Sequence, residues 1–544
     1  MNEGGYGNKE IEREFEYLEI WACHIGGQQG ASLHVSAMTA VETLNALLPS
    51  PRTPSAVLPL PSALPSFIIG LKERSYRHQY ANIYFIRLHC LREFVERRAL
   101  NLWKGLDGNP IAVPRVLEVT KGRLCYIIGT VYMDMPLKPN VLEDVARDQA
   151  LPAPPPLPQY FSDCDSVMLE DESGRIKLVG ERLKGAQVVT GIIMGALGME
   201  TPNGEFEVVD YCFAEIPSQI PEETDDMDID VDEQDWIAVV SGLDIGSDTT
   251  DDAKIQMLVE YLAGEVGCVD DQRSAAQISR LIIAGNSLVP IVEQNEPVEH
   301  RPRRRQIQDI GPISPQPVLD LSAHLYDVAQ TIPVHLLPGE NDPSGIFLPQ
   351  QPLPRAMFGQ VSKSSSFYCE TNPTYLHLQS GQIAKTLLVN SGQPLNDMFK
   401  YLPSPPNTRM DVLESTLKWR HMAPTAPDTL WCHPYFTKDP FIITTMPHLY
   451  IVGCQKKFGT RLVKHEREDE KLQQCRIVMV PNFSETGILV LINVRTLDVK
   501  TISFAADNSG TTDDAELPAS SYSPSEAQTE SMAASSPTQE AFEP

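Results

Sequence analysis

Five short turns, each directly after an apolar run, hold the side chains most able to do chemistry. They are SGLDIGS at 241–247, AGNS at 284–287, PGEND at 338–342, NSG at 390–392 and GCQK at 453–456. Buried parallel strands end in turns of this kind, and α/β proteins usually bind ligands at that edge of the sheet. Asp244 and Glu340 could together hold one hard cation. Two carboxylates without imidazole partners are more often exposed or hydrogen-bonded, so both interpretations stay open.

The first two turns belong to a predicted βαβ unit between Trp236 and Val289. The apolar runs 237–240 and 281–284 have the length of buried strands. Between them, the apolar stripe of an amphipathic helix consists of Ile255, Leu258, Val259 and Leu262. Candidate caps flank that helix, with Asp251 or Asp252 at its start and Gly264 or Gly267 at its end. The unit would bring both turns to one edge of a sheet.

The order of the five turns resembles the metal-binding loops of the calcineurin-like metallophosphoesterases. That family places Asp-x-His, Gly-Asp, Gly-Asn-His-(Asp/Glu), a separate His and Gly-His-x-His at its strand ends. The matching positions here are Gly242 with Asp244, Gly285-Asn286, Pro338 to Asp342, Ser391-Gly392 and Cys454-Gln455-Lys456. No histidine stands at a matched position.

The resemblance implies a phosphoesterase scaffold that has lost its two-metal centre. Two divalent ions about 3.5–4 Å apart need carboxylate and imidazole ligands and a polarised water between them. Gly242 offers no side chain, Asn286 cannot supply an anionic bridge, and Asn341 is a poor proton donor in place of His. Lys456 would add a positive charge beside the metals. We therefore expect no catalytic, cofactor-binding or metal-binding residue in this chain, and no cofactor.

Three histidines outside the matched positions need an assignment. His335 lies inside a predicted strand, before the turn at 338–342, so we expect a core or sheet-face residue and not a ligand. His421 and His433 are the candidates for relic catalytic groups, although neither has a metal-ligand spacing to the other.

Composition excludes several classes of protein. The chain has 544 residues, 42% hydrophobic and 21% charged, which is globular on average, yet 45 prolines and a net charge of -28 indicate sizeable non-globular inserts. A nucleic-acid reader would carry a strongly basic face, so any DNA contact should be indirect or confined to one patch. Ten cysteines without a C-x-x-C pair fit buried thiols in a reducing compartment. No apolar run reaches the roughly 18 residues of a membrane span, and the N-terminus does not read as a secretion signal.

Residues 112–215 predict a β-barrel that follows a helix. The helix has a stripe at helical spacing, which consists of Tyr76, Tyr80, Ile83, Tyr84, Arg87, Leu88 and Leu91. Hairpin turns at 172–174 and 203–204 and a short helix at 141–150 suit an OB-fold barrel of about five strands. Few basic residues alternate with aromatics here, so we favour a barrel that packs or contacts proteins over one that binds single-stranded nucleic acid.

These patterns predict a mixed α+β and α/β chain with an OB-fold barrel, and the phosphoesterase resemblance implies an inactivated metallophosphoesterase-like β-sandwich flanked by helices. The expected organisation is a disordered leader at 1–60, the helix and OB fold at 65–220, an acidic linker at 221–235, the inactive phosphoesterase domain at 236–504 with a disordered insertion at 293–315, and a disordered acidic tail at 505–544. The arginines of the insertion, between Arg301 and Arg305, predict either a nuclear-import signal or an anion contact, with a merely exposed loop equally open.

A helix, an OB barrel and a ligand-stripped phosphoesterase domain together resemble the B-subunits of the eukaryotic replicative DNA polymerases, most closely the small (second) subunits of polymerase delta. The stretches that carry the resemblance include RSYRHQYANIYFIRL, GRLCYIIGTVYMDMPLKPNVLEDVARD, VSGLDIGS, IIAGNSLV, VHLLPGENDPS, NSGQPLNDMFKY and PTAPDTLWCHPYFTKDPFII. The similar region spans roughly residues 65 to 505.

The resemblance implies a non-catalytic accessory subunit in the nucleus. It would bridge the C-terminal cysteine-rich module of the catalytic subunit of polymerase delta and a third, clamp-binding subunit, and such subunits are also shared with polymerase zeta. DNA would be contacted indirectly, with no membrane and no small-molecule substrate. Exposed aromatics of the 76–91 helix and the barrel are the candidate partner surface. The alternatives are a metal-dependent phosphoesterase or 3′-5′ exonuclease with a degenerate site, and a DNA-binding OB protein.

Overall fold

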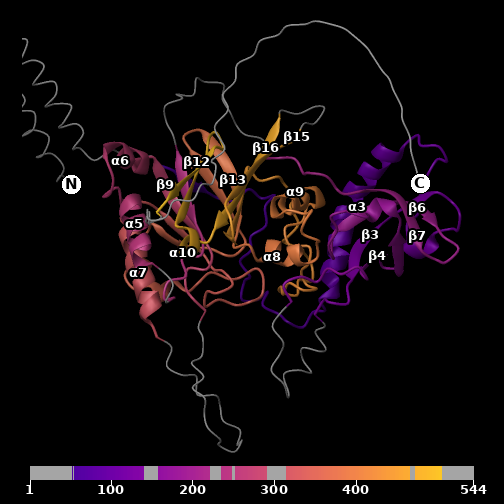
Figure 1. Ribbon diagram of the computed structural model, residues 1–544, viewed down its shortest axis with the longest axis horizontal. Coiled ribbons are helices and arrows are strands. Elements are labelled where there is room, and N and C mark those ends of the chain that lie inside the picture. Colours follow the sequence, from indigo (N-terminus) through magenta and orange to yellow (C-terminus); the bar gives the residue numbers. More distant parts are fainter. Residues whose placement is uncertain are drawn as a thin grey trace, which may run out of the picture. The chain divides into compact units, whose positions relative to one another are not determined.

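Figure 1 shows the structure, a computed structural model of the chain. It describes residues 52, 54–139, 157–220, 235–247, 251–290, 314–465 and 472–504. All of these belong to one compact unit. None of the helices in the described ranges is both long and apolar enough to cross a membrane.

One sheet of a β-sandwich contains the predicted βαβ unit. Its six strands run in the order β11-β10-β9-β8-β17-β18. Their bounds are β8 Trp236–Val240, β9 Ile278–Ala284, β10 Val334–Leu337, β11 Phe367–Cys369, β17 Ile488–Asn493 and β18 Val499–Ser503. Strands β8 to β11 are parallel, and β17 joins β8 in the antiparallel sense. Every residue of β8, β9 and β10 is buried, which explains their continuous apolar runs.

The second sheet has the order β1-β12-β13-β14-β16-β15. Its strands are β1 Ala56–Leu58, β12 Thr374–Ser380, β13 Ile383–Asn390, β14 Leu449–Gln455, β15 Gly459–His465 and β16 Gln473–Pro481. Strands β13, β14 and β16 are parallel. An apolar layer that includes Val239 and Ile282 of the first sheet and Leu387 and Ile451 of the second joins the two sheets. The predicted β-sandwich is therefore confirmed.

Helices cover the outer faces of the sandwich. Figure 1 shows α5 and α7 side by side against the sheet that contains β9. The helices of the sandwich are α5 Asp252–Ala263, α6 Val269–Ala276, α7 Gln316–Ala329, α8 Gln393–Lys400, α9 Arg409–Trp419 and α10 Phe483–Thr486, with short 3-10 turns η3 Arg355–Phe358 and η4 Val361–Lys363. The predicted caps of α5 are confirmed, since Asp251 accepts a hydrogen bond from the Ala253 amide and Gly264 is left-handed.

The predicted barrel closes on itself. Its elements are β2 Ile111–Ala112, β3 Cys125–Asp134, β4 Ser166–Glu170, β5 Arg175–Val179, β6 Ile193–Glu200 and β7 Phe206–Cys212, with η1 Val116–Glu118 and η2 Glu181–Leu183. The strand order is β3-β4-β5-β7-β6, and β6 pairs with β3 to complete the ring. This is the arrangement of an OB fold. Both predicted hairpins are confirmed, at 172–174 between β4 and β5 and at 203–204 between β6 and β7.

Helix α3, Ala81–Trp103, packs on the barrel and buries Ile83, Arg87, Leu88, Leu91, Val95, Ala99 and Trp103. The sequence predicted that this helix also contains Tyr76 and Tyr80, and that prediction is wrong at its start, because Tyr80 is only the N-cap. Tyr76 lies outside the helix, and its ring contacts the rings of Phe347 and His433. Contacts with distant loops therefore override the helical spacing.

The predicted leader and linker need correction. Strand β1 lies within the leader predicted as disordered at 1–60, and it pairs antiparallel with β12. Arg52 donates to the carbonyl oxygens of Leu262 and Ala275, at 2.6 and 3.1 Å. Disorder is thus wrong for residues 54–60. Asp235, assigned to the linker, is fully buried at the start of the first sheet.

Other predictions fall outside the described residues. They concern the rest of the leader, the short helix at 141–150, the linker at 221–234, the arginines between Arg301 and Arg305, all of the insertion up to residue 313, and the tail at 505–544.

A buried ion pair joins α3, the barrel and the sandwich. Arg87 and Asp439 are both fully buried, with Arg87 Nε 2.8 Å from Asp439 Oδ2. The same guanidinium donates to the carbonyl oxygens of Gly191, Pro424 and Ala426, at 3.0, 2.7 and 2.8 Å. Gly191 has φ +91°, and a Cβ there would collide with the Pro424 carbonyl oxygen. The backbone of the barrel therefore contacts the backbone of the sandwich directly, beside the guanidinium of Arg87.

Replacing Arg87 by methionine should lower the free energy of unfolding by about 3–5 kcal/mol, because Asp439 would keep its buried charge without its main partner. The shift of the urea midpoint measures this loss. Arg97 of the same helix pairs with Glu93 at the surface, so R97M should change the free energy by less than about 1 kcal/mol. Equal shifts of the urea midpoint for R87M and R97M would contradict the structural role assigned to the buried ion pair.

Candidate functional site

The five predicted turns meet at one edge of the sandwich, as the sequence predicted. Gly242 N donates to Gly285 O at 2.9 Å, and Asp244 N donates to Asn286 O at 3.1 Å. Asn286 Oδ1 in turn accepts from Asn341 N at 3.0 Å. These bonds follow from the parallel order of β8, β9 and β10, whose carboxyl ends lie together.

Glycine backbones fill the space where the turns meet. A Cβ added at Gly285 would collide with Ser391 Cβ, and one at Gly339 would collide with Asn286. A Cβ at Gly392 would collide with the carbonyl oxygen of Gly453. The turns of the two sheets therefore touch directly, because three of them present no side chain at the contact.

Neutral amides connect these turns. Asn372 is fully buried, and its Nδ2 donates to Gln350 Oε1 at 2.7 Å and to Ser391 Oγ at 2.6 Å. Its Oδ1 accepts from Ser391 N at 3.0 Å, while Gln350 Nε2 donates to Gly339 O at 2.9 Å. An amide both donates and accepts, so it can satisfy neighbouring loops without a cation. We call Gln350, Asn372, Ser391 and Gly339 the amide network.

The carboxylates at this edge have protein partners or face solvent. Asp244 Oδ2 accepts from Ser484 Oγ at 2.8 Å, and burial raises the pKa of Asp244 while hydrogen bonds from Ser484 and Asn341 oppose the rise. Asp342 accepts from the amides of Leu288 and Gly339, and burial raises its pKa to about 6. Asp342 is therefore a structural link between two turns.

The residues do not fit the two-metal centre that the phosphoesterase resemblance would imply. Glu340 and Lys456 are exposed, and Asp244 is already held by its hydrogen bonds. Across the described ranges, no group of three or more His, Cys, Asp or Glu side chains is arranged to hold a metal ion. We derive no metal-dependent step from this edge.

Sequence reasoning missed the two central amides, Gln350 and Asn372. Each lies in a loop between elements and outside the matched motifs. The hydrogen bond between them joins two loops that are 22 residues apart in the sequence. No periodic pattern of residue types therefore points to either amide.

The three histidines are structural. His335 is buried in β10, where its Nε2 lies 2.7 Å from Arg280 Nη1 and its Nδ1 lies 2.9 Å from Glu370 Oε1, which confirms a sheet-face residue. His421 Nε2 lies 2.9 Å from Asp439 Oδ2, its Nδ1 accepts from the Ala423 amide, and its ring lies 6.4 Å from that of Phe441. His433 packs on aromatic rings. Neither proposed relic group contacts the five turns.

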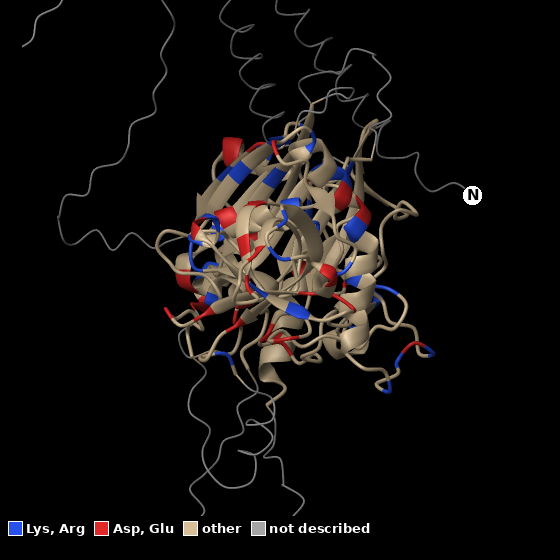
Figure 2. Cartoon of the chain, turned by 90° about the vertical axis from the view of Figure 1, so that its right-hand side faces the viewer, with Lys and Arg blue, Asp and Glu red and all other residues tan. Residues whose placement is uncertain are grey.

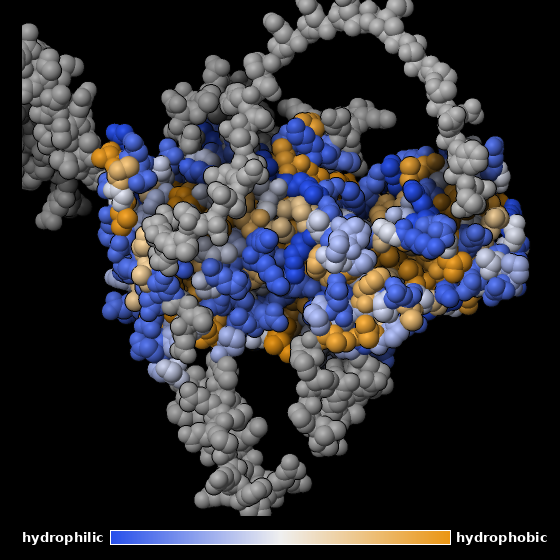
Figure 3. All heavy atoms as spheres, viewed as in Figure 1, coloured by the Kyte–Doolittle hydropathy of each residue, from blue (hydrophilic) through white to orange (hydrophobic). Residues whose placement is uncertain are grey.

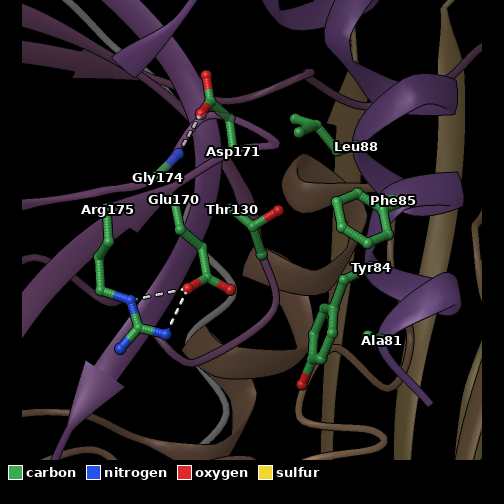
Figure 4. A pocket seen from close by; sticks show the side chains of 9 residues that line it. All are labelled: Ala81, Tyr84, Phe85, Leu88, Thr130, Glu170, Asp171, Gly174 and Arg175. Carbon is green, nitrogen blue, oxygen red and sulfur yellow. Dashed lines mark hydrogen bonds and ion pairs between the residues drawn. The ribbon is translucent and has the colours of Figure 1, made fainter. Parts of the chain in front are cut away.

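Cavities lie elsewhere. A cavity of about 300 Å³ lies between the first turns of α3 and the barrel (Figure 4), and its lining is Ala81, Tyr84, Phe85, Leu88, Thr130, Glu170, Asp171, Gly174 and Arg175. Its helix wall is mainly apolar, and its barrel wall carries the ion pair of Glu170 and Arg175 at 2.6 Å. A neighbouring cavity of about 310 Å³ extends to Pro427 and Asp428 of the sandwich.

Among the described residues, the side of the barrel drawn in Figure 2 shows no broad basic face. Figure 2 shows Lys and Arg interspersed with Asp and Glu over the face it presents. Lys138 Nζ and Arg175 Cζ both lie 4.2 Å from the ring centre of Tyr132, and each cation also pairs with a carboxylate. These features favour packing and protein contact over single-strand binding.

Stability should fall as the pH drops from 6.5 towards 4, in part because of His421. Burial lowers the pKa of His421 from 6.5 to about 4, Arg87 lowers it further, and Asp439 opposes this. In that window the unfolded chain binds a proton that the folded chain does not, so folding loses up to about 3 kcal/mol.

The test is to follow urea midpoints from pH 7 to 4.5 for the parent and for H421Q, which keeps a donor towards Asp439. H421Q should lose less stability across the window. H89Q, which changes an exposed histidine of α3, should match the parent. If the urea midpoints of the parent and of H421Q fell in parallel with decreasing pH, His421 would not be the cause of this pH dependence of stability.

Comparison with known proteins supplies two family matches. Residues 79–211 match the OB-fold domain of the DNA polymerase delta subunit, and residues 237–460 match the B-subunit family of DNA polymerases alpha and epsilon. These ranges agree with the barrel and with most of the sandwich.

Individual relatives are similar over most of the chain. The DNA polymerase delta small subunit of Arabidopsis thaliana is 36% identical over 440 residues, which cover 80% of this chain and 93% of that protein. That of Saccharomyces cerevisiae is 33% identical over 475 residues, 80% and 91% of the two chains. The DNA polymerase II small subunit of Methanothermobacter thermautotrophicus is 25% identical over 338 residues, 59% and 65% of the two chains.

Proposed function

The chain belongs to the family of DNA polymerase delta small subunits, and from that premise we propose that it is a non-catalytic accessory subunit of the replicative polymerase delta complex. In this role it bridges the C-terminal cysteine-rich module of the catalytic subunit and a third, clamp-binding subunit. It acts in replication and repair in the nucleus, contacts DNA indirectly through the complex, and serves polymerase zeta as well.

The amide network is the observation that supports the non-catalytic part of the proposal. Asn372 joins the loops of Gln350 and Ser391 by hydrogen bonds of 2.7 and 2.6 Å. Two divalent ions would have to displace these neutral groups and would find no imidazole ligand in return. The remaining function for this domain is then to bind other proteins through its surface.

The alternative function is a metal-dependent phosphoesterase or 3′-5′ exonuclease with a degenerate site. One observation favours it, namely that Asp244 keeps a carboxylate at a strand end where the phosphoesterases hold a metal ligand. Its hydrogen bonds to Ser484 and Asn341 are the counter-argument.

Purified full-length chain with Mn²⁺ should hydrolyse neither a generic phosphodiester nor a 3′-labelled DNA end above the level of a heat-denatured sample. The reason is the missing ligand set. D244A and E340A preparations should give the same background. Activity in the parent that either substitution abolished would overturn the non-catalytic assignment.

The chain should co-purify with the C-terminal cysteine-rich module of the catalytic subunit when the two are co-expressed. Size-exclusion chromatography of the captured material measures the association. A module whose cysteines are changed to serine is the matched control, because we expect its fold to depend on them. Failure of the intact module to associate would contradict the bridging role.

A further inference from the structure

An exposed aromatic surface is formed by loops of the sandwich and by the segment that precedes α3. On the face drawn in Figure 3, hydrophobic side chains form separate patches among hydrophilic ones, and isolated residues of that kind need no explanation. A contiguous group of exposed hydrophobic side chains does need an explanation. Tyr76, Ile346, Trp431 and Phe436 are 64, 62, 52 and 56% exposed. We call residues 72–78, 346–347 and 431–438 the aromatic surface.

Ring contacts hold this surface in place. The ring centre of Tyr76 lies 6.1 Å from that of Phe347, and Phe347 lies 5.5 Å from Trp431. His78 stacks on Phe436 at 4.7 Å. The backbone segments beneath are also tied, since Leu348 N donates to Trp431 O and His433 N donates to Leu348 O. A surface whose side chains are already ordered loses less entropy when a partner binds.

The aromatic surface is basic, in a chain whose net charge is -28. Its charged residues, leaving aside the histidines His78 and His433 and the neighbouring Asp439 that pairs with Arg87, are the cations Lys72, Arg74, Arg77 and Lys438 and the carboxylate Glu73. Lys438 Nζ lies 3.9 Å from Glu73 Oε2, so it also links two of the segments. Charge complementarity therefore selects an acidic partner.

We propose that the aromatic surface docks an acidic segment of a partner protein that carries an apolar or aromatic anchor side chain. The anchor packs beside Tyr76 and Trp431, and the carboxylates of the segment face Lys72, Arg74 and Arg77. Such pairing of an aromatic centre with a charged rim is the usual anatomy of an interface.

The ring geometry favours protein over single-stranded nucleic acid. Bases stack on open, flat faces. Tyr76 is tilted by 52° to Phe347 and by 74° to His433, so these three rings share no common flat face on which a base could stack. The exposed aliphatic side chains of Ile346 and nearby Leu71 add apolar area that no base requires. The inference goes beyond the proposed function and does not depend on an inactive strand edge.

The test measures fluorescence anisotropy of a labelled peptide, EEDLFDDLEE, against the full-length chain at low salt. We expect saturable binding that weakens with added salt. W431A and the double variant R74E/R77E should each raise the dissociation constant at least about fivefold, which corresponds to roughly 1 kcal/mol. R74E/R77E should keep the thermal midpoint of the parent, because both arginines are exposed. W431A also removes the ring contact with Phe347, so its thermal midpoint is measured beside its affinity.

Matched controls lie on α6 and α7, outside the residues of the aromatic surface. L319A removes an exposed leucine of α7, and R273E reverses an exposed arginine of α6; both should bind like the parent. A peptide with serine in place of its Leu and Phe residues should bind more weakly.

Three results would overturn the proposal. One is equal binding by parent, W431A and R74E/R77E. Another is tighter binding of a single-stranded oligonucleotide that displaces the peptide, which would make the surface a nucleic-acid site. The third is self-association of the chain that W431A abolishes and that excludes the peptide, which would make it a contact between copies.

Discussion

The fold depends on one buried guanidinium. Arg87 arrives from α3 and meets Asp439 of the sandwich and the carbonyl oxygens of Gly191, Pro424 and Ala426. A buried charge is tolerated only when its hydrogen bonds are satisfied, so these backbone segments must approach one point together. That demand explains why Gly191 has no side chain, and why barrel and sandwich share a core in which Leu169 and Phe206 lie with Leu388 and Trp419.

The strand edge obeys the same rule with neutral groups. Parallel strands bring polar turns together whether or not a metal is bound, and buried polar atoms there need partners. Asn372 and Gln350 supply them, and the glycines at 285, 339 and 392 let the turns close onto one another. The turns of this edge are therefore joined by amide hydrogen bonds and close glycine contacts, an arrangement that holds them together through neutral groups.

The parts that could be predicted from the sequence are those set by local pattern. The caps Asp251 and Gly264, the buried runs of β8 and β9, and the hairpin turns follow from residue type and spacing within a few positions. The parts missed are set by distant partners. Arg87 and Asp439 are 352 residues apart, and β1 exists because β12 offers it an edge. Periodicity extended the α3 helix back to Tyr76, although loop aromatics hold that residue instead.

The ion pair also fixes the outer surface. Asp439 directly follows Lys438, and Phe436 lies three residues before it, so the carboxylate that Arg87 holds anchors one end of the aromatic surface. The other end, at Tyr76 and His78, leads directly into α3, the helix that carries Arg87. The stack of His78 on Phe436 and the ion pair of Arg87 with Asp439 therefore join the same two segments of the chain. A partner that contacts both Tyr76 and Phe436 would recognise the helix and the sandwich in their joined arrangement.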